Sequence, residues 1–347
     1  GLQNGEESGV DCGGPCRFCL LTELLPELDD FGNAAATLPR VALFADDRFA
    51  ISYSGAIDDQ ARGRWFAADG TALGASQVLG TNLGVTSKKG YRIPIAIGSE
   101  QDRFSLLLPG LDDMSMNTDL FVLRHAEDGS ELMGTRVNAI DKLSFDGDIV
   151  AEGDRLVVAW AAAGKIWLRR WDWSVANGAW IDIDPFAADD ANVSQYNPGL
   201  SLGADGVAVL SWVHCTNGIC EVLARRFDND WLDPDPVVVS GNDGYFVAPR
   251  VARDQDGRVM VVWSGATANF VFIEARMLDE EFVPIGDVWT VQSNLFAIAD
   301  PDVVALADGS FAVAWGDGDD DRVHLRRFVD AGVPKIADLG DEAPWPN

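Results

Sequence analysis

Three cysteines stand close together near the start of the sequence, at Cys12, Cys16 and Cys19. Their spacing matches that of a three-thiolate iron–sulfur site. The same cysteines could instead hold zinc together with a fourth ligand. They could also form a disulfide in a segment too small to build a core. The stretch VDCGGPCRFC (10–19) that contains them leaves the three chemistries open.

A second candidate for chemistry is the acidic stretch GDGDDDR at 316–322. It places four carboxylates on one predicted hairpin tip: Asp317, Asp319, Asp320 and Asp321. Calcium takes about six to eight oxygen ligands, which clusters of this kind supply. The EF-hand pattern is absent, and solvated tips are common on an acidic protein. Calcium is therefore the one cofactor that the sequence indicates, and solvated carboxylates are the alternative.

Aromatic residues precede several of the regularly spaced prolines. They are Tyr91, Tyr196, Tyr245, Phe246 and Phe296, and Asn197 adjoins Tyr196. Aromatic rings beside amides and carboxylates suit sugars or cationic groups. We expect these residues to gather at one mouth of a central channel as a ligand-binding site. The alternative is that the rings fill gaps between neighbouring sheets.

The elements that position these residues come from a repeat of about 52 residues. Short apolar strands end in a large residue, with steps of 55, 52, 52, 51 and 52: Tyr53, Leu108, Trp160, Trp212, Trp263 and Trp315. A proline or glycine stands 13 or 14 residues before each of them: Pro39, Pro94, Gly147, Pro198, Pro249 and Pro301. A turn of the D-G type recurs between the two, and a strand carrying arginine follows.

Each repeat predicts four short strands joined by turns. Its second strand, such as VMVVW at 259–263, is apolar at every position, which indicates that both faces of the sheet are covered. We therefore predict an all-β fold, a six-bladed β-propeller of four-stranded antiparallel blades over 38–347, after a Cys-rich segment over 1–37. The predicted blades are about 38–90, 91–143, 144–195, 196–246, 247–298 and 299–345. A solenoid is the rival architecture, but its capping units are absent.

The stretch CTNGIC predicts a disulfide between Cys215 and Cys220. Asn217-Gly218 favours a type I′ hairpin turn, which makes the two cysteines a directly opposed pair with Cα atoms about 4.5 Å apart. A structural disulfide indicates an oxidising compartment. That setting and an all-β fold disfavour a cluster at the N-terminal cysteines, so we expect two of Cys12, Cys16 and Cys19 to pair.

The composition restricts partners and location. The chain has 55 acidic and 26 basic residues, for a net charge of −29, which repels nucleic acid. No apolar run reaches the roughly 18 residues that span a bilayer, and the first residues have no signal-peptide pattern. We expect a secreted or outer-surface protein whose targeting segment, or lipid anchor, preceded Gly1 and was removed.

Two parts of the sequence resemble known families. The pattern P-x-V-A…D-G-x-F-V-V-x-W…R-x-F-D, clearest at 249–263 and 301–315, resembles a propeller-forming repeat of secreted and surface proteins of bacteria. Tyr53 and Leu108 depart from its tryptophan. The stretch NGEESGVDCGGPCRFC (4–19) is similar to a short segment near the N-termini of exported bacterial proteins. In that segment a further cysteine precedes the Asn-Gly pair. Neither resemblance implies catalytic residues.

No nucleophile elbow, metalloprotease motif or phosphate loop occurs in the sequence. We therefore expect a non-catalytic propeller that acts as a binding or scaffolding module for protein or carbohydrate at the cell surface. The alternative is a propeller enzyme, a polysaccharide hydrolase or lyase that uses carboxylates at the channel mouth. Its carboxylates would come from separate blades, and a sequence does not reveal their separation.

Overall fold

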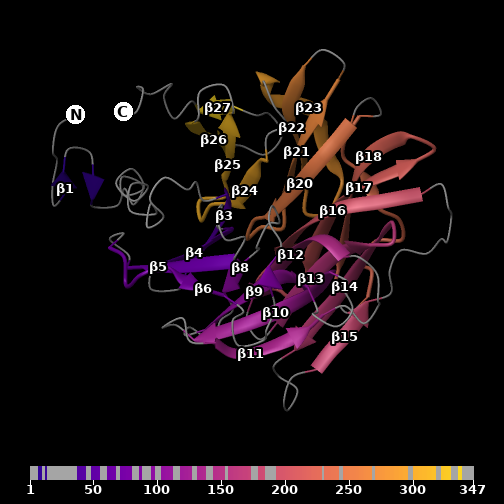
Figure 1. The fold of residues 1–347 in the computed structure, drawn as a ribbon. Helices are drawn as coiled ribbons and strands as arrows, with labels where there is room; N and C mark the ends of the chain where they lie inside the picture. Colours follow the sequence, from indigo (N-terminus) through magenta and orange to yellow (C-terminus); the bar gives the residue numbers. More distant parts are fainter. Residues whose placement is uncertain are drawn as a thin grey trace. The chain divides into compact units, whose positions relative to one another are not determined.

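The structure is a computed structural model of the 347-residue chain, shown in Figure 1. It describes residues 7–9, 12–13, 37–43, 48–54, 61–67, 71–79, 86–87, 95–97, 103–111, 118–126, 131–137, 144–152, 155–172, 179–183, 193–228, 230–241, 245–267, 270–295, 300–317, 322–329 and 335–337. Every regular element in these ranges is a strand, as the sequence predicts. Within the same ranges, no helix is long and apolar enough to cross a membrane.

The chain divides into two compact units, Gly1–Leu143 and Ser144–Asn347. The first unit holds a small hairpin of β1 (Glu7–Gly9) and β2 (Cys12–Gly13). Its first larger sheet has β3 (Thr37–Leu43), β4 (Phe49–Ser54), β5 (Ala61–Phe66) and β6 (Gln77–Val78). Its second has β7 (Thr86–Ser87), β8 (Ile95–Ile97), β9 (Arg103–Leu111), β10 (Thr118–Ala126) and β11 (Glu131–Arg136). Both β7 and β8 pair with β9, so this sheet has five strands.

The second unit holds four antiparallel sheets of four strands, each in chain order. The first two sheets comprise β12 (Ser144–Glu152), β13 (Arg155–Ala162), β14 (Lys165–Asp172), β15 (Ala179–Ile183), then β16 (Val193–Leu202), β17 (Ala208–Thr216), β18 (Ile219–Phe227) and β19 (Val237–Val238). The last two comprise β20 (Tyr245–Arg253), β21 (Val259–Ala266), β22 (Val271–Leu278), β23 (Pro284–Leu295), then β24 (Asp302–Ala305), β25 (Phe311–Asp317), β26 (Arg322–Val329) and β27 (Lys335–Ala337).

The second strand of each sheet in this unit forms the core. Along β21, Val261 packs in a cluster with β17 of the preceding sheet, and Val262 packs in a cluster with β25 of the following sheet. Trp263, which ends the apolar run, is fully buried. Truncating a buried Trp to Ala typically costs about 3–5 kcal/mol, so these repeated residues account for much of the packing energy. The prediction that VMVVW is covered on both faces is confirmed.

Hydrogen bonds between neighbouring sheets follow the period of the sequence repeat. The Leu200 N–H donates to Asp148 Oδ2 at 2.8 Å, across 52 residues. The Arg253 N–H donates to Ser201 Oγ at 3.0 Å, again across 52 residues. Arg258 Nη2 donates to the Gly309 carbonyl at 2.7 Å, across 51 residues. One repeat of sequence is therefore one step from sheet to sheet.

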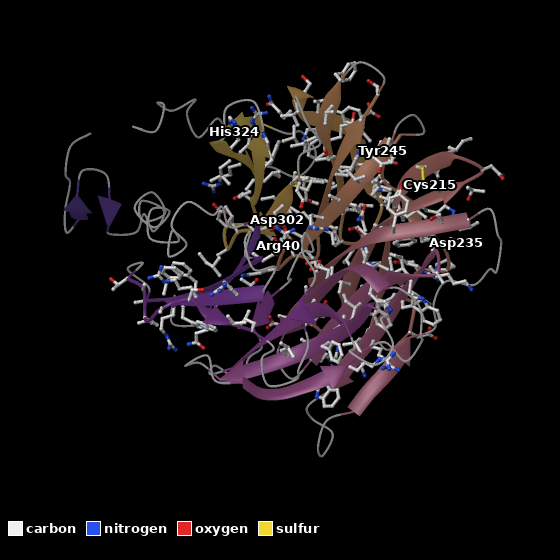
Figure 2. The ribbon with its side chains drawn as sticks, in the orientation of Figure 1. Arg40, Cys215, Asp235, Tyr245, Asp302 and His324 are labelled. Atoms are coloured by element: carbon white, nitrogen blue, oxygen red, sulfur yellow. A yellow bond between two sulfur atoms is a disulfide. The ribbon has the colours of Figure 1, made fainter. Side chains whose placement is uncertain are left out.

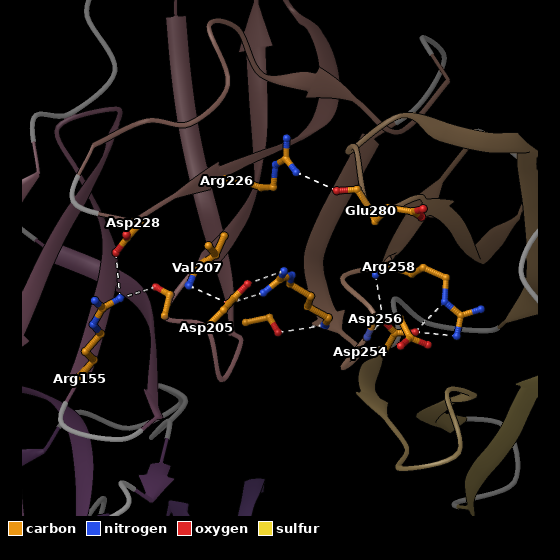
Figure 3. Close-up of polar contacts among 12 residues, drawn as sticks. Arg155, Asp205, Val207, Arg226, Asp228, Asp254, Asp256, Arg258 and Glu280 are labelled. Carbon is orange, nitrogen blue, oxygen red and sulfur yellow. Dashed lines mark hydrogen bonds and ion pairs between the residues drawn. The ribbon is translucent and has the colours of Figure 1, made fainter.

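Several arginine side chains donate to the D-G turns of neighbouring sheets (Figure 3). Arg155 Nη1 donates to the Gly206 carbonyl at 3.0 Å and to Asp228 Oδ1 at 2.8 Å. Gly206 has a φ of +82°, which L side chains rarely adopt. A Cβ on Gly206 would lie 1.7 Å from Arg155 Nη1. The glycine is needed both for the turn and for the approach of the arginine.

The predicted disulfide between Cys215 and Cys220 is confirmed. The two cysteines are directly opposed across β17 and β18, and Thr216 opposes Ile219 inside them. Asn217 and Gly218 both have positive φ, 53° and 83°, as a type I′ turn requires. The Cα atoms are 4.0 Å apart, close to the predicted separation.

Candidate functional site

Two first strands of the second unit, β16 and β20, are bulged at the residue before a repeated proline. The register shifts between Tyr196 and Gly199 on β16, and between Val247 and Arg250 on β20. At the bulges, Asn197 and Ala248 have φ values of 51° and 53°. A left-handed backbone is rare for a residue other than glycine and costs energy, and such conformations concentrate at functional sites. Bulges are also common next to active sites, because a bulge redirects the side chains of its strand.

We call Asn197, Ala248 and Asp300 the pre-proline row, since each directly precedes a repeated proline. β16 contacts β20, and β20 contacts β24, which begins two residues after Asp300. Asn197 Oδ1 lies 3.5 Å from the Ala248 nitrogen, a long hydrogen bond that connects the first two positions. Asp300 is half-buried, and its Oδ1 is inaccessible to solvent. The row therefore places an amide, a methyl group and a carboxylate in or directly before successive first strands.

Two tyrosines lie beside this row. The Tyr196 hydroxyl is 3.3 Å from Cys215 Sγ and 3.9 Å from Cys220 Sγ, so it packs against the disulfide. Burial raises the pKa of Tyr196, and the Tyr245 phenol raises it further. The Tyr245 side chain is 55% exposed, and Figure 2 shows it near Cys215. Tyr196 thus keeps its proton at neutral pH, and Tyr245 offers an accessible ring.

The structure places the other predicted ligand-binding residues differently or does not describe them. Phe246 is 1% exposed and belongs to the core cluster that contains Trp263. Its ring supports β20 from within and does not reach solvent. Tyr91 and Phe296 lie outside the described residues. A ligand-binding role for the tyrosines stays a prediction.

The predicted metal and N-terminal cysteine sites also lie mostly outside the described ranges. Only the backbone of Asp317 and of Cys12 is described, and the remaining predicted residues are not: Asp319, Asp320, Asp321, Cys16 and Cys19. Within the ranges that are described, no three His, Cys, Asp or Glu side chains gather as metal ligands. Calcium at 317–321 and the pairing of the three cysteines stay predictions.

A polar cluster on the opposite face of β16 and β17 was not anticipated as a unit. The Ile166 N–H donates to Gln195 Oε1 at 3.1 Å, and Gln195 Nε2 lies 3.4 Å from His214 Nδ1. His214 Nε2 lies 3.0 Å from Thr216 Oγ1. Because Oε1 already accepts, Gln195 presents its amino group to Nδ1, and the imidazole proton sits on Nε2. Alternate side chains of a strand point to opposite faces, so this cluster lies on the other face of the sheet from Tyr196. The same alternation could have predicted from the sequence that Gln195, His214 and Thr216 do not share a face with Tyr196.

Electrostatics distinguish these groups. Burial lowers the pKa of His214, and the Glu221 carboxylate partly offsets this shift. Burial raises the pKa of Glu274, and the Trp263 indole partly offsets it. Glu274 lies on β22, two strands away from β20, so it is not part of the pre-proline row. His214 is therefore neutral at pH 7, and Glu274 is a half-buried carboxyl group on β22.

Comparisons with known proteins place the fold. No protein-family model matches the chain, and none of the curated proteins matches it. Among solved structures, a protein of unknown function from Dyadobacter fermentans is similar with a TM-score of 0.59 and 13% identity, covering 84% of this chain and 93% of that one. A polysaccharide lyase, an ulvan lyase bound to a GlcA–Rha3S saccharide, is similar at 0.53 and 12% identity, covering 83% and 78%. The Penicillium chrysogenum α-L-arabinanase, complexed with arabinobiose, is similar at 0.55 and 13%, covering 84% and 93%.

At such low identity these likenesses define the class of fold. The chain is all-β and of the β-propeller type, built from successive antiparallel sheets. The finer prediction, six blades closed into one ring, is not shown, because the sheets are separate and fall into two units.

The expectation of a non-catalytic binding or scaffolding module is contradicted by these comparisons. Two of the three solved structures described above are enzymes that act on polysaccharide. The expectation relied on the absence of a local catalytic motif. In a fold built from repeated sheets, reactive side chains come from strands about 50 residues apart, so a local motif is not required.

Proposed function

We propose that this chain is a polysaccharide-active enzyme, a hydrolase or a lyase, built on a six-bladed β-propeller. The observation that carries the proposal is the likeness to the ulvan lyase and the arabinanase, which extends over 83% and 84% of this chain. Fold alone does not define a reaction, so the proposal also needs groups suited to sugar chemistry.

The contacts between first strands support a ring. In the second unit β12 contacts β16, β16 contacts β20, and β20 contacts β24. In the first unit β3 contacts β8. Strands that meet their counterparts in neighbouring sheets are the innermost strands of a propeller. We propose that they line a central channel, with the pre-proline row at one mouth.

The residues at this mouth suit a carbohydrate. The exposed ring of Tyr245 can stack on a sugar face, and the Tyr196 hydroxyl can donate a hydrogen bond. Asp300 supplies a partly buried carboxyl group as the proton donor or acceptor. A hydrolase would protonate the glycosidic oxygen while water or a second carboxylate attacks the anomeric carbon. A lyase would instead remove a proton next to a uronate carboxyl group and eliminate the glycosidic oxygen.

The disulfide supports a location outside the cytoplasm. Cys215 and Cys220 are bonded at the tip of the β17–β18 hairpin. Disulfides persist in oxidising compartments. We propose that the enzyme is secreted or held at the outer cell surface, where polysaccharide is encountered as polymer.

The test is a screen of the purified chain against uronate-containing, sulfated and neutral polysaccharides. Hydrolysis releases reducing ends alone, whereas elimination also creates an unsaturated uronate end with ultraviolet absorbance. We expect new reducing ends from at least one polymer and none with heat-denatured protein. Intact polymers across the whole panel, with and without added Ca²⁺, would refute the proposed function.

A further inference from the structure

Arg250 is a buried cation directly after Pro249 in β20. Three arginines among the described residues are at least nine-tenths buried: Arg64 (8% exposed), Arg170 (6%) and Arg250 (8%). A buried guanidinium is costly unless a charge or several hydrogen bonds compensate it. The partners of these three side chains therefore show whether each has a structural role.

The buried charges of Arg64 and Arg170 are compensated by nearby groups of the protein. Arg170 Nη1 lies 3.8 Å from Asp228 Oδ1. Arg64 Nε donates to the Gly74 carbonyl at 3.1 Å, and its guanidinium lies 5.7 Å from the Phe66 ring centroid. Both arginines thus stabilise the fold.

Among the residues that the structure describes, Arg250 has far less compensation. Its Nη1 donates to the carbonyl of the preceding Pro249 at 2.8 Å. Within the part of the chain that the structure describes, this is its one hydrogen bond, and no carboxylate forms an ion pair with it. Arg250 keeps 8% of its surface exposed to solvent. The Nε and Nη2 edge presents two parallel donors, and no described residue supplies an acceptor for it.

The backbone around Arg250 brings it next to the pre-proline row. It lies two residues after Ala248, at the end of the β20 bulge. A Cβ on Gly199 of β16 would be 2.6 Å from the Pro249 carbonyl oxygen and 3.3 Å from Arg250 Cα. Glycine at 199 therefore lets the two first strands approach closely at the backbone of Pro249 and Arg250. The arginine and the row occupy the same stretch of neighbouring first strands.

We propose that Arg250 binds an anionic substituent of the polysaccharide, a carboxylate or a sulfate, and that the substrate is an anionic polysaccharide. The inference rests on the proposed function and adds its substrate class. A planar guanidinium edge matches either oxyanion with two parallel hydrogen bonds. The protein carries a net charge of −29, so an anionic polymer is repelled at long range and needs a local cation to bind.

Binding to defined oligosaccharides tests the inference. Isothermal titration at about 0.5 M NaCl screens the long-range repulsion while leaving a buried contact largely intact. The probes are oligomers of polygalacturonate, of a sulfated galactan and of arabinan. We expect one of the two anionic oligomers to bind, which distinguishes carboxylate from sulfate, and Arg250→Met to weaken that binding at least about tenfold. Arg250→Lys keeps the positive charge but loses the two parallel donors, so its affinity should lie between those of wild type and Arg250→Met.

The matched control is Arg253→Met on the same strand. Arg253 is ion-paired with Asp205 at 2.6 Å and should leave the affinity within about twofold. Wild-type affinity in Arg250→Met, or tighter binding of arabinan than of both anionic oligomers, would overturn the inference. If the enzyme cleaves neutral polymers only, the proposed function stands and the substrate class is wrong. If no polymer is cleaved, the proposed function itself is refuted.

Discussion

At the scale of single residues, the structure places Tyr196 and His214 in two different polar environments, although they lie on adjacent strands. Tyr196 and His214 lie on neighbouring strands, yet alternate side chains point to opposite faces of the sheet. Tyr196 meets the disulfide and Tyr245, whereas His214 meets Gln195 and Thr216. The tyrosine belongs to the candidate site, and the histidine belongs to the seam with the preceding sheet.

His214 should make the fold sensitive to mild acid. Its pKa is lowered in the folded protein by burial, while in the unfolded chain it is about 6.5. The unfolded chain therefore binds more protons between the two values. The stability that neutral His214 contributes is complete above about pH 6.5 and is lost as the pH falls through the folded-state pKa.

We expect the melting temperature of wild type to fall on acidification from about pH 7.5 to 5.5. The melting temperature of His214→Gln should fall less over the same range, because it has no imidazole to protonate. Thr216→Val, which removes a hydrogen-bond partner but keeps the imidazole, should retain the wild-type drop. Differential scanning calorimetry measures both. An equal drop in His214→Gln and wild type would show that His214 does not control the response.

At the scale of elements, the arginines that reach neighbouring D-G turns connect one sheet to the next. Arg155 and Arg258 occupy equivalent places two repeats apart and donate to Gly206 and Gly309 of the following sheets. Arg226 donates to the Glu280 carbonyl in a similar way at 3.0 Å. These bonds fix the step between sheets and hence the positions of the first strands that carry the candidate site.

Substitution of Gly206 should disrupt this connection. In Gly206→Ala the new Cβ clashes with Arg155 and the positive φ is strained, so we expect a loss of about 1–3 kcal/mol in the free energy of unfolding. Gly241→Ala, where a Cβ meets nothing within 4 Å, should change it by about 0.5 kcal/mol or less. Urea denaturation measures both variants.

A double variant separates the two causes of the loss. Adding Arg155→Met to Gly206→Ala removes the clash but keeps the backbone strain, so the two substitutions should not be additive. Additive losses would mean that the arginine and the turn are not coupled.

At the scale of the whole molecule, the repeat could be predicted from the sequence because each copy needs a large buried residue in its second strand. Trp212, Trp263 and Trp315 are buried in equivalent second strands, and the Asn217-Gly218 turn opposes its cysteines as predicted. The role of Arg250 could not be predicted, because its burial, and the lack of a counter-charge among the described residues, depend on packing between β20 and its neighbours. The pairing of β7 with β9 was also missed, because the two-residue strand Thr86–Ser87 carries no pattern of its own.

We propose that the first strands form the active mouth of a polysaccharide-active enzyme. It depends on Asp300, whose partly buried carboxyl group stands in the pre-proline row. Asp302 is two residues away, exposed, and accepts the Val303 N–H at 3.0 Å, so it is a matched control.

The direct measurement is the initial rate of Asp300→Asn and of Asp302→Asn on the polymer that wild type cleaves best. Loss of a catalytic proton donor or acceptor should lower the rate of Asp300→Asn by about 10²–10⁴-fold at an unchanged melting temperature. Asp302→Asn should stay within about twofold of wild type. Wild-type turnover in a folded Asp300→Asn variant would contradict the account.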